Sequence, residues 1–272
     1  MVTNAPSGER TQYELEELVA TSRALSSERD IKKLLAVILE KCRQVTGADA
    51  GSVYVIEEEG GSEAEYKAPP KKVLHFMLSQ NDSTQIDFKD FKLEVDDRSI
   101  VGQAALSKQP INVADLSEAG RTPTLRHNKS FDDKSGYRTR SMLTVPMMSA
   151  IGNVIGVVQL INKKRDSSRP LGLNNPDGVV PFDHRTEGLA LAWVAMAGIA
   201  LENAELYKEI RTMFDGFVDA SVMAIEQRDP TTSGHSRRVA TLSVALAQRV
   251  DAVSAGPLAP VTFTDTQLQQ IE

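Results

Sequence analysis

Two apolar runs decide the fold of this chain: Ser141-Met142-Leu143-Thr144-Val145-Pro146-Met147-Met148 and Val154-Ile155-Gly156-Val157-Val158-Gln159-Leu160-Ile161. Both are rich in large apolar and β-branched residues, and the turn Ala150–Asn153 separates them. Runs of this length on either side of a short turn predict two neighbouring strands of an antiparallel sheet.

Shorter runs of the same kind occur earlier in the chain, and the first covers residues 50–56. After it we predict an acidic turn at Glu57–Gly61 and a loop over residues 62–72. We expect all the strands to form one antiparallel sheet. Its members are residues 50–56, 73–78, 92–95, 110–113, 141–148 and 154–162.

Helical patterns flank these strands. One covers residues 11–25, and a second begins at a capping-box pattern, Ser27 with Asp30, and ends at Gly47. A short helix over residues 100–106 precedes a long polar connection, residues 115–139, of a kind usually found over a ligand site. The order of the elements predicts an α+β domain with one antiparallel sheet flanked by helices.

Composition bounds the class of protein. The chain has 272 residues, 41% hydrophobic and 25% charged, which suits one large or two modest globular domains. Its net charge of −6 argues against a general nucleic-acid binder. Cys42, the only cysteine, falls on the apolar face of a predicted helix and is expected in the core. Residues 1–10 are a polar tail, and no run approaches membrane-spanning length, so we expect a cytoplasmic protein with no membrane association.

A long helix is predicted over residues 186–228, which contain no proline. Its apolar residues recur at spacings of three and four, as in a coiled coil, and Asn203 falls at a seam position that commonly fixes the register of dimers. Up to Leu201 the helix is apolar nearly all round and is expected to pack on its own sheet as well. Beyond it we expect a homodimer seam. The seam positions are Met196, Ile199, Leu206, Ile210, Met213, Phe217, Ala220 and Ala224.

Several segments in the correct order resemble the GAF family of small-molecule sensor domains over residues 11–205. They are Gly51-Ser52-Val53-Tyr54, Ser99-Ile100-Val101-Gly102, Arg140-Ser141-Met142-Leu143-Thr144-Val145-Pro146 and Gly156-Val157-Val158-Gln159-Leu160-Ile161-Asn162-Lys163. The resemblance implies a ligand pocket beneath the 115–139 connection.

Asn162, Lys163, Phe182 and Glu187 are similar to the motif of the GAF branch that binds cyclic nucleotides. In that branch the lysine and an aspartate form an ion pair that braces the pocket. Here Thr186 takes the place of the aspartate, which leaves Lys163 to pair with Asp183 or Glu187, or to lie in water. The alternative is that Asn-Lys is a common strand ending in GAF domains of every ligand class.

The expected walls of the pocket come from four parts of the chain. Backbone N–H groups at the start of the 100–106 helix would receive a phosphate or carboxylate. Asn128 and Asp132 would read a base edge, and Phe131 and Tyr137 would stack on a ring. Each of these is equally well explained as a loop-surface residue. The predicted lining residues are Ser52, Ile100, Val101, Gly102, Asn128, Phe131, Asp132, Tyr137 and Thr144.

Residues 213–272 resemble the beginning of an HD-GYP domain, the metal-dependent phosphodiesterases that degrade cyclic di-GMP. The stretch that carries the resemblance is Ala224-Ile225-Glu226-Gln227-Arg228-Asp229-Pro230-Thr231-Thr232-Ser233-Gly234-His235-Ser236-Arg237-Arg238-Val239. His235 matches the first metal-binding histidine of that family, and Thr231 stands where some members carry a further metal-binding glutamate. The resemblance implies an iron- or manganese-type metal pair in a complete domain. The His-Asp pair that would complete the site is missing before Glu272, so we expect no catalytic residue, no bound cofactor and no phosphodiesterase activity in this chain.

Two functional hypotheses follow. The first is the sensor and dimeric transmitter region of a bacterial HD-GYP-type cyclic di-GMP phosphodiesterase, with a cyclic nucleotide or similar purine as ligand. The second is a non-enzymatic GAF dimerisation or interaction module with a vestigial pocket. A third, weaker alternative is a complete short protein whose helical tail docks a partner.

Overall fold

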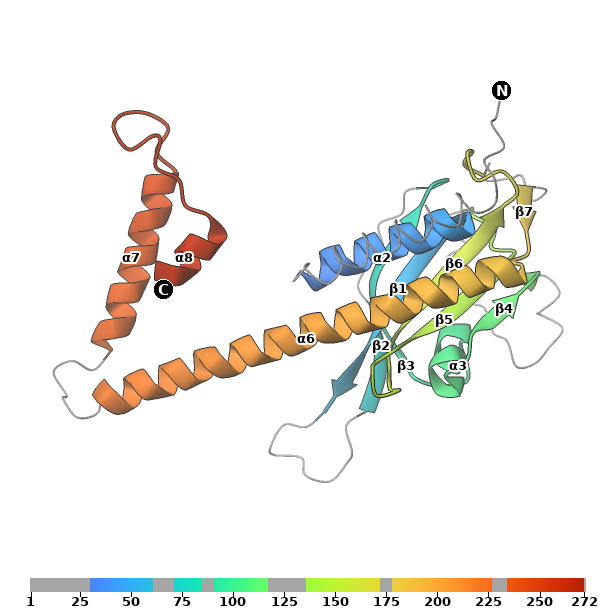
Figure 1. Cartoon of the computed structure of the whole chain (residues 1–272), viewed down its shortest axis with the longest axis horizontal. Helices are drawn as coiled ribbons and strands as arrows, with labels where there is room; N and C mark the ends of the chain where they lie inside the picture. The colour runs from blue at the N-terminus through green and yellow to red at the C-terminus, as the bar shows by residue number, and fades with distance from the viewer. Residues whose placement is uncertain are drawn as a thin grey trace, which may run out of the picture. The chain divides into compact units, whose positions relative to one another are not determined.

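A seven-stranded antiparallel sheet forms the centre of the fold (Figure 1). The computed structural model describes residues 30–60, 71–84, 91–116, 136–171, 178–226 and 234–271. The strands lie in the order β3-β2-β1-β6-β5-β4, and β7 pairs with β6. Their bounds are β1 Ala48–Glu59, β2 Lys71–Asn81, β3 Lys92–Glu94, β4 Ile111–Val113, β5 Met142–Met148, β6 Val154–Lys164 and β7 Val179–Val180.

All six predicted strands are present in this one sheet, so the predicted architecture is confirmed. The sequence did not indicate β7, which has only two residues. The predicted turn at Glu57–Gly61 is wrong over its first part, because β1 continues to Glu59. Glu59 lies opposite Lys71 on β2, and Lys92 Nζ of β3, the strand beyond β2, donates to Glu59 Oε1 at 2.8 Å. Lysines of both strands therefore offset the acidic charge at the end of β1.

Helices α2 and α6 pack on one face of the sheet, and α3 packs on the other (Figure 1). The larger core lies under α2 and α6, where Leu35, Leu143 and Leu201 have no exposed surface. Burying side chains of this size contributes about 2 kcal/mol each. The helices are α2 Ile31–Thr46, α3 Ile100–Ser107, α6 His184–Glu226, α7 His235–Asp251 and α8 Asp265–Ile271.

Helix α2 is capped at both ends by its own sequence. Asp30 is the N-cap, and its carboxylate accepts hydrogen bonds from the backbone N–H groups of Lys32 at 2.9 Å and Lys33 at 3.2 Å. The prediction of Ser27 as the capping residue is therefore wrong, because the helix begins at Ile31. Gly47 ends the helix with φ at 72°, as predicted. Cys42 is fully buried on this helix, as expected, and burial raises the pKa of its thiol to about 12.

Helix α6 changes character along its length. Ala204 is its last buried residue, and beyond it Ile210, Met213 and Phe217 are 60%, 66% and 69% exposed. The chain forms two compact units, Met1–Tyr207 and Lys208–Glu272, and α6 continues from the first into the second. The segment His184–Ile225 is long and apolar enough to cross a membrane by length and composition alone, and 44% of its most apolar window is buried within the protein. A single helix of this kind is weak evidence for a membrane span.

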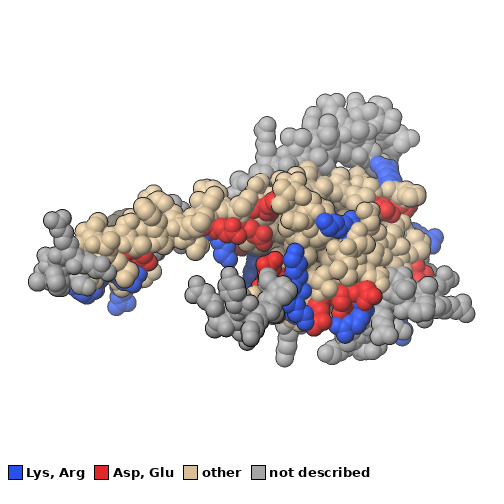
Figure 2. Space-filling view, turned by 90° about the horizontal axis from the view of Figure 1, so that it is seen from below, with Lys and Arg blue, Asp and Glu red and all other residues tan. Residues whose placement is uncertain are grey.

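Ion pairs cover part of the domain surface. On the face shown in Figure 2, acidic and basic side chains interleave. Lys71 pairs with Glu94, and Lys92 reaches Glu57 at 2.9 Å and Glu59 at 2.8 Å.

The predicted tail 1–10 and the predicted helix 11–25 lie outside the described residues.

Candidate functional site

Three polar side chains cross the middle of the sheet on the face that α3 covers. Gln159 on β6 lies opposite Ser52 on β1 and opposite Thr144 on β5. We call Ser52, Gln159 and Thr144 the polar row. Their neighbours two residues away, Tyr54, Val157 and Met142, pack with residues of α3, which places the row on the same face. All three members of the row are buried.

Gln159 has weak hydrogen-bond partners within the described residues. Its amide nitrogen donates to Met142 Sδ at 3.1 Å and to Thr144 Oγ1 at 3.4 Å, a poor acceptor and a long bond. Among the residues that the structure describes, none donates to its Oε1. The Gln159 amide therefore has hydrogen-bonding capacity that the described residues do not fill, although its Oε1 is not one of the fully buried atoms that lack a partner. Gln159 was not among the predicted site residues, although a lone amide within an otherwise apolar run is a signal that the sequence contains.

The start of α3 is closed by its own cap. Ser99 is the N-cap, and its hydroxyl accepts a hydrogen bond from the Gly102 N–H at 3.0 Å. A Cβ on Gly102 would lie 2.0 Å from the Asp96 carbonyl oxygen, so only glycine fits there. Ile100 and Val101 are buried. Of the N–H groups predicted to receive an anion, the one on Gly102 is therefore already engaged.

Tyr137 and Asp49 form a buried pair at the end of the 115–139 connection. The Tyr137 hydroxyl donates to Asp49 Oδ2 at 2.8 Å, and neither residue is more than 2% exposed. Burial and the neighbouring carboxylate raise the pKa of Tyr137. Asp49 Oδ1 also accepts from Ser83 Oγ at 2.9 Å and Leu171 N at 3.4 Å. The Asp49 carboxylate thus joins three loop segments, those of Tyr137, Ser83 and Leu171, to the start of β1. Asn128, Phe131 and Asp132 lie outside the described residues.

Asn162 fastens the end of β6 to the chain that enters β5. Its backbone has φ at 54°, a left-handed conformation that asparagine tolerates better than most residues. Its Oδ1 accepts from Arg140 N at 2.7 Å, and its Nδ2 donates to the Arg138 carbonyl oxygen at 2.8 Å. Asn162 is 1% exposed, so these bonds hold the 115–139 connection where it rejoins the sheet.

Lys163 pairs with Asp183, the residue immediately before α6. Lys163 Nζ also donates to Thr186 Oγ1 at 3.3 Å. Of the three outcomes that the sequence left open for Lys163, the structure shows the pairing with Asp183, which supplies the carboxylate from a position three residues before Thr186. Asp183 also accepts from the Thr186 N–H at 2.9 Å. Hydrogen bonds from Lys163 and from the Thr186 backbone lower the pKa of Asp183 well below its usual range.

Phe182 and Glu187 complete the contacts of the motif. Phe182 is buried in the larger core, and its carbonyl oxygen accepts from Asn112 Nδ2 at 3.0 Å. The same Asn112 nitrogen donates to Glu187 Oε2 at 2.8 Å. The motif residues Asn162, Lys163, Phe182 and Glu187 therefore join β6, β4 and the start of α6 to one another.

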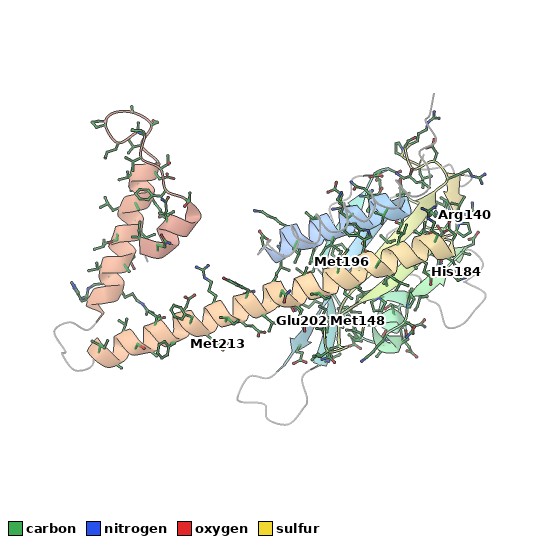
Figure 3. The ribbon with its side chains drawn as sticks, in the orientation of Figure 1. Arg140, Met148, His184, Met196, Glu202 and Met213 are labelled. Atoms are coloured by element: carbon green, nitrogen blue, oxygen red, sulfur yellow. The ribbon has the colours of Figure 1, made fainter. Side chains whose placement is uncertain are left out.

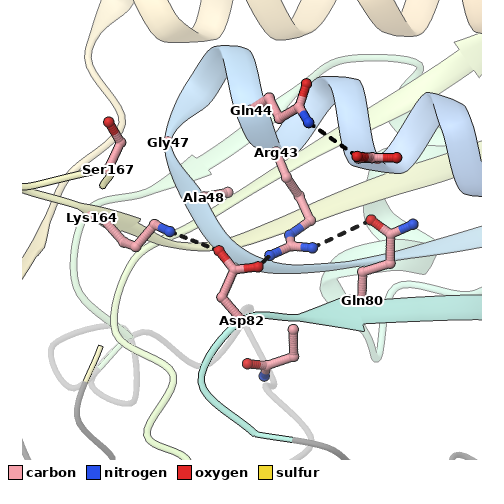
Figure 4. Close-up of a pocket in the computed structure, with 10 residues that line it drawn as sticks. Arg43, Gln44, Gly47, Ala48, Gln80, Asp82, Lys164 and Ser167 are labelled. Carbon is pink, nitrogen blue, oxygen red and sulfur yellow. Dashed lines mark hydrogen bonds and ion pairs between the residues drawn. The ribbon is translucent and has the colours of Figure 1, made fainter. Parts of the chain in front are cut away.

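An open pocket of about 560 Å³ lies elsewhere, at the end of α2 (Figure 4). Arg43 and Lys164 both pair with Asp82 there, the latter at 2.7 Å, and Arg43 also donates to Gln80 Oε1 at 3.3 Å. None of the predicted lining residues belongs to this pocket.

His235 is the first residue of α7, as predicted, and Gly234 before it has φ at 70°. Within the described residues, no group of three or more histidine, cysteine or acidic side chains is placed to hold a metal ion. The residues that the structure describes therefore do not fit a two-metal centre. His75, by contrast, has a partner on the neighbouring strand, with its Nδ1 lying 2.6 Å from Glu57 Oε1.

Comparison with known proteins relates this architecture to a family. The dual 3',5'-cyclic-AMP and -GMP phosphodiesterase 11 of Drosophila melanogaster is 24% identical over 185 residues, which are 68% of this chain and 12% of that protein. A cGMP-specific 3',5'-cyclic phosphodiesterase of Drosophila ananassae is 28% identical over 195 residues, 68% of this chain and 14% of that protein. The chain thus spans a small part of the curated relatives it matches.

A solved structure of a GAF domain/HD domain protein from Geobacter sulfurreducens has a TM-score of 0.43 and 16% identity, and the match covers 67% of this chain and 98% of that one. The family model for the GAF domain matches residues 30–201, which contain the whole sheet, α2, α3 and most of the buried part of α6. The match extends over more than half of the chain, which therefore belongs to the GAF domain family.

Proposed function

We propose that residues 30–201 bind a small ligand of the cyclic-nucleotide class against the polar row beneath α3. The observation that carries this proposal is the Gln159 amide, buried in an apolar face with weak acceptors for its nitrogen and no described donor for its oxygen. A purine edge offers both donors and acceptors at the spacing of an amide, so it would satisfy Gln159 on both sides.

The relatives support a nucleotide ligand over other classes. Those named above are, by their names, phosphodiesterases of cyclic AMP or cyclic GMP. The match covers only 12–14% of their length, so it supports a module shared with these proteins and gives no support for their catalytic activity in this chain. The Lys163–Asp183 pair supports the same reading, since it restores the bracing interaction of the nucleotide-binding branch.

In this proposal α6 transmits the state of the pocket to the second unit through a parallel homodimer. The apolar stripe of Leu206, Ile210, Met213 and Phe217 is exposed in the single chain and has coiled-coil spacing. The same stripe favours the second candidate function, a non-enzymatic dimerisation or interaction module whose pocket is vestigial.

The parent protein, in this proposal, is a cytoplasmic bacterial HD-GYP-type cyclic di-GMP phosphodiesterase. Support for this part comes from the sequence around His235, which opens a helix directly after a glycine turn. A divalent metal pair would belong to the complete domain, and this chain alone is expected to be inactive.

Titration calorimetry with cyclic AMP and cyclic GMP tests the ligand. We expect one of them to bind the unmodified chain and to bind Gln159→Leu at least tenfold more weakly, because leucine, an apolar residue of similar size, removes both polar groups. Gln80→Leu, in the pocket at the end of α2, is the matched control and should bind normally. Absence of heat from both nucleotides with the unmodified chain would reject the nucleotide proposal and leave the dimerisation module.

A further inference from the structure

The turn between β5 and β6, residues 149–153, is held by helices from both faces of the sheet. The Ala150 N–H donates to Glu202 Oε2 of α6 at 2.8 Å. Lys108, the C-cap residue of α3, donates from its Nζ to the Gly152 carbonyl oxygen at 2.9 Å. The helix that covers the polar row and the helix that continues into the second unit therefore bind the same short turn.

The turn is braced internally. Ser149 N donates to the Asn153 carbonyl oxygen at 2.8 Å, and Gly152 N donates to the Ser149 carbonyl oxygen at 3.0 Å. Asn153 N also donates to Ser149 Oγ at 3.1 Å, and Gly152 has φ at 81°. A turn closed by three hydrogen bonds moves as one piece, so a displacement at Gly152 is passed to Ala150.

Helix α6 fits closely against the strand that leads into the turn. A Cβ on Gly198 would lie 2.3 Å from the Met148 carbonyl oxygen, so the helix approaches the strand as closely as the backbone permits. Glu202, labelled in Figure 3, lies one turn further along α6, where its carboxylate accepts from the Ala150 N–H. Ala204, the last buried residue of α6, follows at once. The turn therefore contacts α6 at the end of its buried part, just before the helix becomes exposed.

We propose that the 149–153 turn is the mechanical link between α3 and α6. A shift of α3 over the polar row displaces Gly152 through its hydrogen bond with Lys108. The turn then moves, and the hydrogen bond from the Ala150 N–H to Glu202 is strengthened or weakened. The part that concerns ligand signalling rests on the proposed function, whereas the energetic coupling of Lys108 to α6 does not.

Amide hydrogen exchange of the full chain tests the coupling without a ligand. Glu202→Gln weakens the direct contact and should speed exchange over residues 199–207. Lys108→Ala, which removes a contact to the turn and none to α6, should speed exchange over the same residues by about two- to fivefold, as expected for the loss of one exposed hydrogen bond. The double variant should exchange no faster than Glu202→Gln alone, because both act through one link. Lys72→Ala, an exposed lysine on β2, is the control.

Unchanged exchange in Lys108→Ala, or effects that add in the double variant, would overturn the link. A second arm adds cyclic GMP, then cyclic AMP, and should alter exchange over residues 199–207 in the unmodified chain and not in Glu202→Gln. If neither nucleotide binds, the proposed ligand is wrong while the variants still decide the link. If one binds and α6 does not respond, the link carries no ligand signal and that part of the proposal fails.

Discussion

Asp183 performs two tasks at the start of α6, since it accepts hydrogen bonds from both the Lys163 ammonium and the Thr186 N–H. The ion pair joins the end of β6 to the helix, and the N-cap fixes where the helix begins. Separate substitutions distinguish the two contributions.

Asp183→Asn keeps a capping oxygen and loses the charge, so we expect the free energy of unfolding to fall by less than about 1 kcal/mol, because the carboxylate is 60% exposed. Asp183→Ala also loses the cap and should cost about 1 kcal/mol more. Urea denaturation measures both. Lys163→Met removes the pair and spares the cap, so a cost equal to that of Asp183→Ala would contradict this division.

The same aspartate should make stability depend on acid. The folded-state pKa of Asp183 lies below its unfolded value of about 4, so its favourable contribution is complete above pH 4 and is lost as the pH falls through the folded value. We therefore expect the stability difference between the unmodified chain and Asp183→Asn to be constant from pH 7 to pH 5 and to shrink below pH 4. Thermal unfolding across this range checks it; a difference that grows in acid would refute the assignment.

A second carboxylate at Thr186 should not help while Asp183 is present. Thr186→Asp places two negative charges around one ammonium and removes the hydroxyl that bonds to the Asp183 carbonyl oxygen at 2.9 Å, so stability should fall or stay unchanged. The exchange variant, Asp183→Ser with Thr186→Asp, restores one cap and one carboxylate and should recover most of the loss. Greater stability in the single variant than in the exchange variant would show that Lys163 needs both carboxylates.

Asp49 is the buried acceptor on which three connections depend. Asp49→Ala leaves the Tyr137 and Ser83 hydroxyls without this acceptor and should cost about 3 kcal/mol, whereas Tyr137→Phe should cost about 1–2 kcal/mol. The double variant should cost less than the sum, because both remove the same bond. Additive losses in denaturation curves would mean that the bond between Tyr137 and Asp49 contributes nothing. Ser83→Ala serves as the milder control.

The apolar stripe predicts a dimer. Ile210→Asp puts a charge in the centre of the proposed seam and should yield monomers in sedimentation experiments, while Thr212→Asp, two residues away and off the seam, should leave the mass unchanged. A monomeric unmodified chain, or equal masses for both variants, would exclude the seam.

The strands were predictable because each carries a local signal of its own. Residues 141–148 and 154–161 are mostly apolar, and their pairing follows from the short turn that joins them. The extension of β1 through Glu57 and Glu59 was not predictable, because acidic residues indicate a turn when they are read alone. Only the fold shows that lysines of β2 and β3 lie beside them.

The candidate site divides in the same way. Phe182, Glu187 and Lys163 were identified from their resemblance to the motif of the nucleotide-binding GAF branch, whereas Gln159 acquires meaning only when strand pairing places it between Ser52 and Thr144. The choice of Asp183 over Glu187 as the partner of Lys163 depends on where the helix begins, a boundary that local sequence leaves uncertain by a residue or two.

An unbroken helix between the two units makes the length of the connecting segment a matter of angle as well as distance. Each residue of α6 adds about 1.5 Å and about 100° of rotation. Inserting one alanine after Glu209 would lengthen the helix little, yet it would turn everything beyond by more than a quarter of a circle and break the alignment of Leu206 with Ile210. An insertion of seven residues restores the facing almost fully. Exchange of segments between this chain and other sensors should therefore succeed only at junctions that preserve the rotational phase of α6.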